Sequence, residues 1–185
     1  VHETYRAGRE WVAPSDVTLD ESGDKRRAIV TATGEEAEIG AVEKMSKSKK
    51  NTIGPEEITQ SYGADTARWF MLSDSPPDRD VEWNDRGAEG AHRFVQRIWR
   101  VISTAAPSLK AGDATGAEGQ SLAMRKAAHK ALKAIGEDFE KLAFNRAIAR
   151  VHELLNEIAP IVEKAAGGPE PDKAAAHEAL SILVQ

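Results

Sequence analysis

The chain has 185 residues, 41% hydrophobic and 30% charged, with a net charge of −5, a size and composition typical of a globular protein with a buried core. It has no cysteine, which excludes disulfide bonds, thiolate catalysis and cysteine-bound zinc. No apolar run is long enough to span a bilayer and no signal-peptide pattern opens the chain, so we expect a cytoplasmic protein without a membrane partner.

Residues 1–43 predict short β-strands. Brief β-prone runs occur at Tyr5, Trp11-Val12, 17–19 and 28–31, and the turn signals 22–24 and 33–35 separate them. So few apolar residues could hardly stabilise a free-standing domain. We therefore expect a small β-rich segment that belongs to a larger protein.

Residues 44–51 read Lys-Met-Ser-Lys-Ser-Lys-Lys-Asn, and they have no apolar periodicity. We predict a mobile surface loop without local structure. Its lysines are flexible point charges, and with the serine hydroxyls they suit a polyphosphate ligand. Four lysines in a loop are by themselves also compatible with an ordinary solvated surface.

Two helices are expected after this loop. Pro55 is well placed as the first residue of a short helix that ends at Gly63, and Asp65 can cap a second helix that stops before Ser75-Pro76-Pro77. Asn84 or Asp85 can cap the helix that follows. We expect Trp69, Phe70 and Trp83 to pack in a core. Together, residues 44–84 form the second predicted segment.

Residues 86–106 predict an amphipathic helix with a basic face. Arg86, Arg93, Arg97 and Arg100 fall within about 60° of one another on a helical projection, opposite Phe94 and its apolar neighbours. Residues 86–133 hold nine Lys/Arg and three Asp/Glu, so the basic excess of an acidic chain is concentrated here. We favour phosphate contact over a merely solvated face.

The rest of the chain predicts a helix bundle. We expect a flexible linker at 107–120, then helices at 121–138, 140–166 and 171–185. Lys126 and Lys130 belong to a second basic face, for which RNA contact and a solvated surface are both open. The predicted fold class is mainly α (α+β), with a β-rich segment at 1–43 and an incomplete antiparallel helix bundle at 85–185.

The pentapeptide Lys44–Ser48 resembles the signature loop of class I aminoacyl-tRNA synthetases. Its continuation through Lys49-Lys50-Asn51 and Gly54-Pro55, and the later run 62–68, are also similar to that family, most closely to its bacterial leucyl branch. Trp11-Val12-Ala13-Pro14 resembles part of the small insertion that the leucyl branch carries before this loop. The likeness is dense from about 11 to 99 and looser beyond.

This resemblance implies ATP-dependent activation of leucine and transfer to tRNA(Leu). It assigns Lys47 and Lys44 to stabilising the departing pyrophosphate and Lys44, Met45, Ser46, Lys47 and Ser48 to ATP binding. Mg²⁺ is expected to arrive with ATP, no protein-bound metal is expected in this fragment, and we expect a monomer. The tRNA-binding residues that we expect are Arg86, Arg93, Arg97, Arg100, Lys126 and Lys130.

Other parts that this family needs are absent from the sequence. We find no His-Ile-Gly-His box, Rossmann strands, amino-acid pocket or editing domain. The chain starts at Val1 and ends in an apolar run, so we expect a piece of a longer polypeptide that is inactive alone. Two alternatives stay open: a non-catalytic RNA-binding helical module, and a structural helical scaffold whose lysine loop is incidental.

Overall fold

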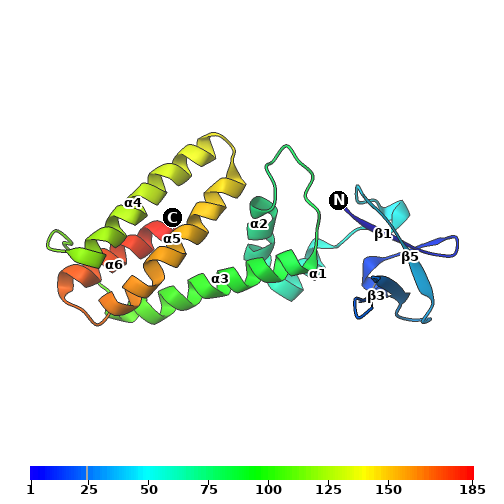
Figure 1. The fold of residues 1–185 in the computed structure, drawn as a ribbon, viewed down its shortest axis with the longest axis horizontal. Coiled ribbons are helices and arrows are strands. Elements are labelled where there is room, and N and C mark those ends of the chain that lie inside the picture. Colours follow the sequence, from blue (N-terminus) through cyan, green and yellow to red (C-terminus); the bar gives the residue numbers. More distant parts are fainter. Residues whose placement is uncertain (24) are drawn as a thin grey trace. The chain divides into compact units, whose positions relative to one another are not determined.

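The computed structural model describes residues 1–23 and 25–185, which divide into two compact units; Figure 1 labels the six α-helices and the strands β1, β3 and β5. The first unit comprises Val1–Ala67 and Asp80–Glu89, and the second comprises Arg68–Arg79 and Gly90–Gln185. The predicted fold class is confirmed, because a small antiparallel sheet is combined with a chain that is otherwise mainly helical. The predicted division at 1–43, 44–84 and 85–185 stays a prediction.

The first unit is built on an antiparallel sheet with the strand order β2-β1-β5-β4-β3. Its strands are β1 (His2–Ala7), β2 (Glu10–Val12), β3 (Val17–Asp20), β4 (Arg27–Val30) and β5 (Glu36–Glu43). The predicted β-prone runs form strands, and Tyr5, Ala28 and Ala37 are buried between them. The predicted turn at 33–35 contains Gly34 in the left-handed region, whereas Asp24 of the other turn lies outside the described residues.

The pairing of β1 with β5 brings both ends of these strands together. His2 is the register partner of Glu43, so the first residue of β1 lies beside the last residue of β5. Gly40 allows this close pairing, because a Cβ atom there would collide with the Thr4 side chain. The Thr4 hydroxyl donates to the Ala41 carbonyl at 3.1 Å across the same pair. The lysine loop therefore begins from a well-fixed strand end.

Two helices follow the loop as predicted, with one difference. α1 (Pro55–Tyr62) starts at Pro55 and ends at Gly63, whose φ is 85°. α2 (Ala64–Ser73) begins directly after Gly63, so Asp65 lies in its first turn and does not precede the helix as a cap. The next cap is Asn84, whose side-chain oxygen accepts the Gly87 N–H at 2.7 Å at the start of α3 (Asp85–Ala105).

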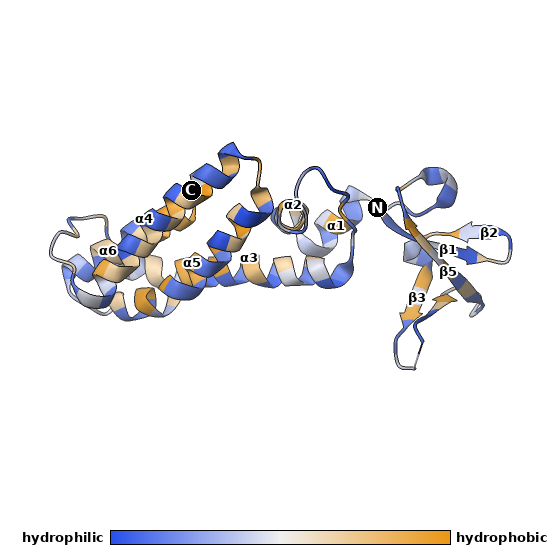
Figure 2. Cartoon of the chain, turned by 45° about the horizontal axis from the view of Figure 1, so that its top comes forward, coloured by the Kyte–Doolittle hydropathy of each residue, from blue (hydrophilic) through white to orange (hydrophobic). Residues whose placement is uncertain are grey.

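The second unit contains the predicted bundle, formed by α4 (Gly119–Glu140), α5 (Phe144–Ala165) and α6 (Glu170–Leu183). Met124, Ile158 and Val162 are fully buried in one cluster with the alanines of α6, whose small side chains let the helices approach closely. Figure 2 shows hydrophilic residues along the outer edges of α4 and α5. In the part of the chain that the structure describes, no helix is long and apolar enough to cross a membrane.

Aromatic residues of α2, α3 and α5 meet in this unit. The His152 ring stacks on Phe94 with 3.5 Å between centroids, and the Trp69 indole N–H donates to His152 Nε2 at 3.4 Å. Since an indole can only donate, Nε2 is the acceptor and His152 is neutral, in accord with burial, which lowers its pKa. Phe70 and Trp83 are buried as predicted, and Trp69 is half-buried.

The flexible linker predicted at 107–120 is wrong. A short 3₁₀ helix occupies Ala106–Ser108, and the side chains of Leu109, Ala114 and Ala117 are buried in the bundle core. The high glycine, alanine and serine content that suggested flexibility therefore has another role. Small side chains let an extended segment pack closely against the helices, where its burial offsets the lost conformational entropy.

The helix predicted from residue 140 starts later, at Phe144. Leu142 adopts a left-handed conformation with φ 54°, which separates α4 from α5 by a tight turn. Asp138, only 2% exposed, holds this turn: its carboxylate binds Arg150 at 2.6 Å and also pairs with Arg146, and its carbonyl accepts the Ala143 N–H at 2.8 Å. The Arg150 hydrogen bond, followed by that of Arg146, lowers the pKa of Asp138 despite its desolvation.

This lowered pKa predicts an acid-sensitive turn. The stabilisation is fully present above the ordinary Asp pKa of about 3.9 and is lost as the pH falls below it, because protonation breaks the ion pairs. We expect Asp138→Asn to lower the thermal unfolding midpoint at pH 7 and to flatten its decline below pH 4, measured by circular dichroism. Glu140→Gln, an exposed neighbour on the same helix, is the control, and an equal effect of the two changes would contradict the prediction.

Candidate functional site

The lysine loop directly follows β5 and contains a turn that the sequence did not predict. Lys47–Lys49 form a single 3₁₀ turn. The Ser46 hydroxyl accepts the Lys49 N–H at 3.3 Å, and the Lys50 N–H returns to the Lys47 carbonyl at 3.3 Å. Lys50 closes the turn in the left-handed region with φ 53°. The expectation of a loop without local structure is therefore wrong, because short-range side-chain bonds replace apolar packing here.

Asn51 fastens this turn to the sheet. Its side chain is 0% exposed, and its Oδ1 accepts the Ser46 N–H at 2.8 Å. Its Nδ2 donates to the His2 carbonyl at 3.2 Å, with the Glu43 and Lys44 carbonyls at the 3.5 Å limit. One amide thus joins the loop to the start of β1 and the end of β5.

The lysines of the loop fall into two groups. Lys44 and Lys47 are exposed, and among the residues that the structure describes neither has a carboxylate within ion-pair distance. Lys49 is half-buried and pairs with Glu43 at the end of β5. Lys50, which closes the turn, is exposed as well. Three positive charges of the loop are therefore available to an anionic ligand, and the fourth, that of Lys49, is already neutralised.

The remaining loop residues lie closer to the protein. Met45 and Ser46 are half-buried, whereas Ser48 is exposed with its hydroxyl 3.3 Å from that of Ser46. No cluster of three metal-binding side chains occurs within residues 1–23 and 25–185. The donor set of the loop consists of ammonium and hydroxyl groups, which suit phosphate oxygens and not a cation.

Trp11 of β2 lies next to the loop. The Lys49 ammonium is 5.8 Å from the centroid of its ring, and the Arg6 guanidinium is 4.4 Å away. A cation over an aromatic face is attracted by the negative face of the ring. The β-rich segment therefore contributes directly to holding Lys49 in place.

The predicted arginines of α3 differ in what they contact. Arg86 binds Glu21 of the first unit at 2.6 Å, and Arg97 donates to the Asn156 side chain at 2.6 Å in the second unit. Arg93 and Arg100 are both exposed. Trp99, on the same helix, is 71% exposed and is the most exposed of the large hydrophobic residues that the structure describes. Arg86 is thus engaged in an ion pair, and its contribution to a basic face requires that pair to open.

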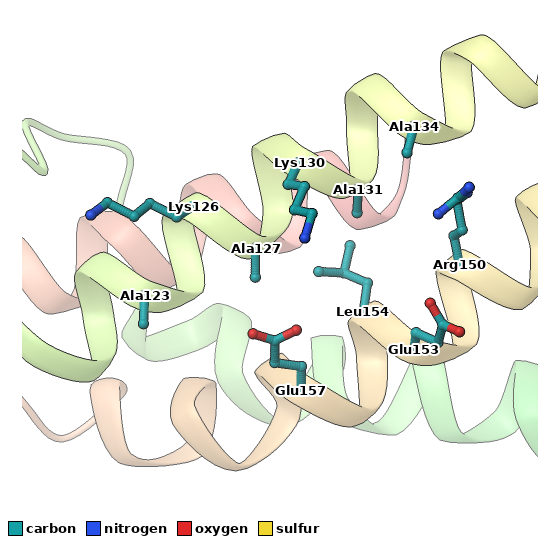
Figure 3. A pocket seen from close by; sticks show the side chains of 10 residues that line it. All are labelled: Ala123, Lys126, Ala127, Lys130, Ala131, Ala134, Arg150, Glu153, Leu154 and Glu157. Atoms are coloured by element: carbon teal, nitrogen blue, oxygen red, sulfur yellow. The ribbon is translucent and has the colours of Figure 1, made fainter.

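Lys126 and Lys130 line a groove of about 430 Å³ between α4 and α5. Figure 3 shows Lys130 pointing into this groove, while Lys126 extends away from its centre. Alanines of α4 and Leu154 form the floor, and Glu153, Glu157 and Arg150 come from α5. The groove therefore carries charges of both signs. Their α4 neighbours Arg125 and His129 both bind Glu178 of α6 at 2.6 Å and act within the bundle.

Sequence reasoning did not identify the residues that support the loop. Asn51, Glu43 and Trp11 carry no pattern that indicates burial or contact, because each comes from a different element and they meet only through the β1–β5 pairing. The one available signal was the side-chain amide of Asn51, five residues after Ser46, which can both donate and accept hydrogen bonds. In a loop that consists mainly of polar residues, such an amide does not stand out.

The two groups of lysines predict different reactivities. We expect limited acetylation at low reagent concentration to label Lys44 and Lys47 before Lys49, because the Lys49 ammonium is engaged by Glu43 and lies over Trp11. Peptide mass spectrometry measures the order. Glu43→Gln should raise the labelling of Lys49 alone, with Glu38→Gln on the same strand as the control. Equal labelling of all three lysines in the unchanged chain would contradict this assignment.

The comparisons with known proteins agree with this site. Residues 37–84, which include the whole loop, match the family model described as tRNA synthetases class I (I, L, M and V). Leucine–tRNA ligases of Chelativorans sp., Mesorhizobium japonicum and Brucella anthropi are 59%, 58% and 55% identical to the chain, and each alignment covers 100% of it. The chain spans only 21–22% of the length of these relatives.

A solved structure shares the fold. The LeuRS of Agrobacterium radiobacter K84 (agnB2), crystallised in a ternary complex with tRNA and LeuAMS, matches 76% of this chain and 18% of its own length, with a TM-score of 0.64 and 22% identity. At this identity the likeness concerns the fold alone. The family match at the loop and the leucine–tRNA ligase alignments along its full length make the chain similar to part of the class I tRNA synthetases.

Proposed function

We propose that this chain is the part of a leucine–tRNA ligase that carries its pyrophosphate-stabilising lysine loop and part of its tRNA-binding surface. The observation that carries the proposal is the pair of exposed lysines, Lys44 and Lys47, in a loop that lies inside the matched family segment. The relatives named leucine–tRNA ligase, aligned over the whole chain, support the choice of amino acid.

The reaction has two steps. A carboxylate oxygen of leucine attacks the α-phosphorus of ATP, the bond to the β-phosphate oxygen breaks, and pyrophosphate leaves with additional negative charge. A ribose hydroxyl at the tRNA 3′ end then attacks the carbonyl carbon of the leucyl adenylate, and AMP leaves. Mg²⁺ enters with ATP and neutralises phosphate charge; the loop, with its ammonium and hydroxyl groups, contacts the phosphates directly.

The lysines act in the first step. Cations aimed at the leaving pyrophosphate stabilise the transition state more than bound ATP, which is the requirement for raising kcat. Lys47 has the main role in this proposal and Lys44 supports it, while Met45, Ser46 and Ser48 shape the loop around ATP. The leucine pocket and the other half of the ATP site lie in parts of the ligase beyond this chain, so the chain alone is inactive.

The proposed tRNA contacts are Arg86, Arg93, Arg97 and Arg100 on α3 and Lys126 and Lys130 on α4. The LeuRS with the same fold was crystallised with tRNA, which supports tRNA as the partner. Exposed arginines on a long helix suit the regularly spaced phosphates of an RNA backbone. We further propose that the ligase acts as a monomer in the cytoplasm.

The role of Lys47 is testable in a full-length leucine–tRNA ligase that carries this chain's sequence over the aligned stretch. We expect Lys47→Ala to lower kcat of leucine-dependent ATP–pyrophosphate exchange by about 10²–10³, as loss of one transition-state contact does. Lys44→Ala should have a smaller effect, and KM for leucine should not change. Lys110→Ala removes the same charge from an exposed position in the second unit and serves as the control. Unchanged kcat in Lys47→Ala would refute the assigned role.

The tRNA surface is testable by salt titration. We expect the chain to bind tRNA(Leu) with an affinity that falls steeply as salt rises, since binding releases counterions from the phosphates. Combined Arg93→Ala, Arg97→Ala and Arg100→Ala substitution should reduce the slope of log K against log salt by about three.

Arg27→Ala is the control for this titration, because Arg27 is an exposed arginine of the β-rich segment outside the proposed surface. An unchanged slope in the triple variant would mean that the α3 arginines are solvated surface. Equal binding of tRNA(Leu), a non-cognate tRNA and a generic polyanion would assign the selectivity to other parts of the ligase.

A further inference from the structure

We propose that Asn51 is a positioning residue for the activation step: its buried amide holds the main chain of the lysine loop in the conformation from which Lys44 and Lys47 act on pyrophosphate. This inference rests on the function proposed above and deepens it. Asn51 touches no reacting atom, and its effect passes through the loop that it fastens.

The contacts of Asn51 reach three places in the fold. Oδ1 binds the Ser46 N–H at 2.8 Å inside the loop, and Nδ2 binds the His2 carbonyl at 3.2 Å in β1. The Glu43 and Lys44 carbonyls at the end of β5 are 3.5 Å from the same nitrogen. Since Lys44 and Lys47 lie on either side of Ser46, fixing this residue restricts the main chain of both lysines.

Only an amide of this length satisfies these partners. The Ser46 N–H donates, whereas the His2, Glu43 and Lys44 carbonyls accept, and Asn supplies both an acceptor and a donor from adjacent atoms. Aspartate would lack the donor and would place a negative charge among carbonyl oxygens in a fully buried position. Alanine would leave the Ser46 N–H and the His2 carbonyl without this partner.

The second connection of the loop is of a different kind. Lys49 pairs with Glu43, and the two side chains are 36% and 40% exposed. An ion pair that is so accessible to water is weak and readily opened. The Asn51 bonds are shielded from water and do not compete with it. Thus Lys49 can leave Glu43 when ATP binds while the buried amide keeps the loop attached to the sheet.

Precise attachment matters because the lysines have long, flexible stems. A catalytic cation stabilises the transition state only when it is held in place before the charge develops, and a shift of about 1 Å can lower the rate about a hundredfold. The 3₁₀ turn supplies local order but does not by itself fix the loop to the strands. The Asn51 amide provides the buried part of this attachment.

The test uses a full-length leucine–tRNA ligase that carries this chain's sequence over the aligned stretch, with Asn51→Ala, Asn51→Asp and the exposed neighbour Thr52→Ala as the matched control. We expect Asn51→Ala and Asn51→Asp to lower kcat of ATP–pyrophosphate exchange roughly ten- to a hundredfold. KM for leucine and Kd for tRNA(Leu) should stay within about twofold, because both sites lie outside this contact.

A double variant separates positioning from a merely structural role. If Asn51 acts through Lys47, Asn51→Ala combined with Lys47→Ala should lose no more kcat than Lys47→Ala alone, because the two residues act as a unit. Losses that multiply would overturn the proposal, and so would wild-type kcat in Asn51→Ala.

Two further measurements keep the outcome interpretable. If the thermal unfolding midpoint shows that Asn51→Ala does not fold, Asn51→Gln takes its place. This variant retains the amide but shifts it by one methylene. It should lower kcat with the same non-additivity toward Lys47→Ala.

Brief trypsin digestion should cleave after Lys44, Lys47 and Lys49 faster in the Asn51 variants than in Thr52→Ala. Faster cleavage with no exchange activity in the unsubstituted enzyme would refute the proposed function; normal exchange with unchanged cleavage would refute the role of Asn51.

Discussion

The arrangement of the first unit depends on how the ends of β1 and β5 are joined to the loop that follows them. β1 is the first and β5 the last strand of the sheet along the chain, and their pairing places His2 beside Glu43. The buried Asn51 amide then bonds both strand ends and Ser46. Because these bonds are shielded from water, a short and highly charged loop acquires a defined main chain without any apolar core of its own.

The β-rich segment therefore also helps to position the lysine loop. The Lys49 ammonium lies over the Trp11 ring and is neutralised by Glu43. Two elements of the sheet, β2 and the end of β5, therefore hold this one lysine in place. The neighbouring Lys44 and Lys47 stay accessible. Separating structural from available cations in this way leaves positive charge accessible at the two positions that the proposed chemistry uses, and also at Lys50.

The second unit shows how charge is divided between packing and surface. Arg146 and Arg150 bind Asp138 at the turn between α4 and α5, and Arg125 binds Glu178 between α4 and α6. These basic residues hold helices together and are only partly available to a ligand. Arg93 and Arg100 of α3 and Lys126 and Lys130 of α4 remain exposed. Within residues 86–133, the pairing of Arg86 with Glu21 and of Arg125 with Glu178 reduces the positive charge that an RNA could meet.

Local patterns in the sequence were sufficient for most elements. Pro55 starts α1 because the φ of proline is fixed near helical values, and Gly63 ends it because glycine, which has no Cβ, adopts a positive φ without strain. The apolar periodicity of α5 reflects the face that this helix buries. The resemblance to the family could be found for a similar reason, because the Lys-Met-Ser-Lys-Ser motif consists of consecutive residues that can be recognised without the tertiary structure.

Long-range contacts decided the rest. Leu109, Ala114 and Ala117 are buried although the composition of 109–118 resembles a linker, since only the assembled bundle provides a surface for them. The attachment of the loop by Asn51 and the pairing of Arg86 with Glu21 likewise join residues from separate elements. The sequence by itself determined which residues could form helices, strands and a phosphate-binding loop. Only the tertiary structure decided which of their charges are neutralised and which amide fixes the loop, because hydrogen bonds and ion pairs depend on distances that folding alone sets.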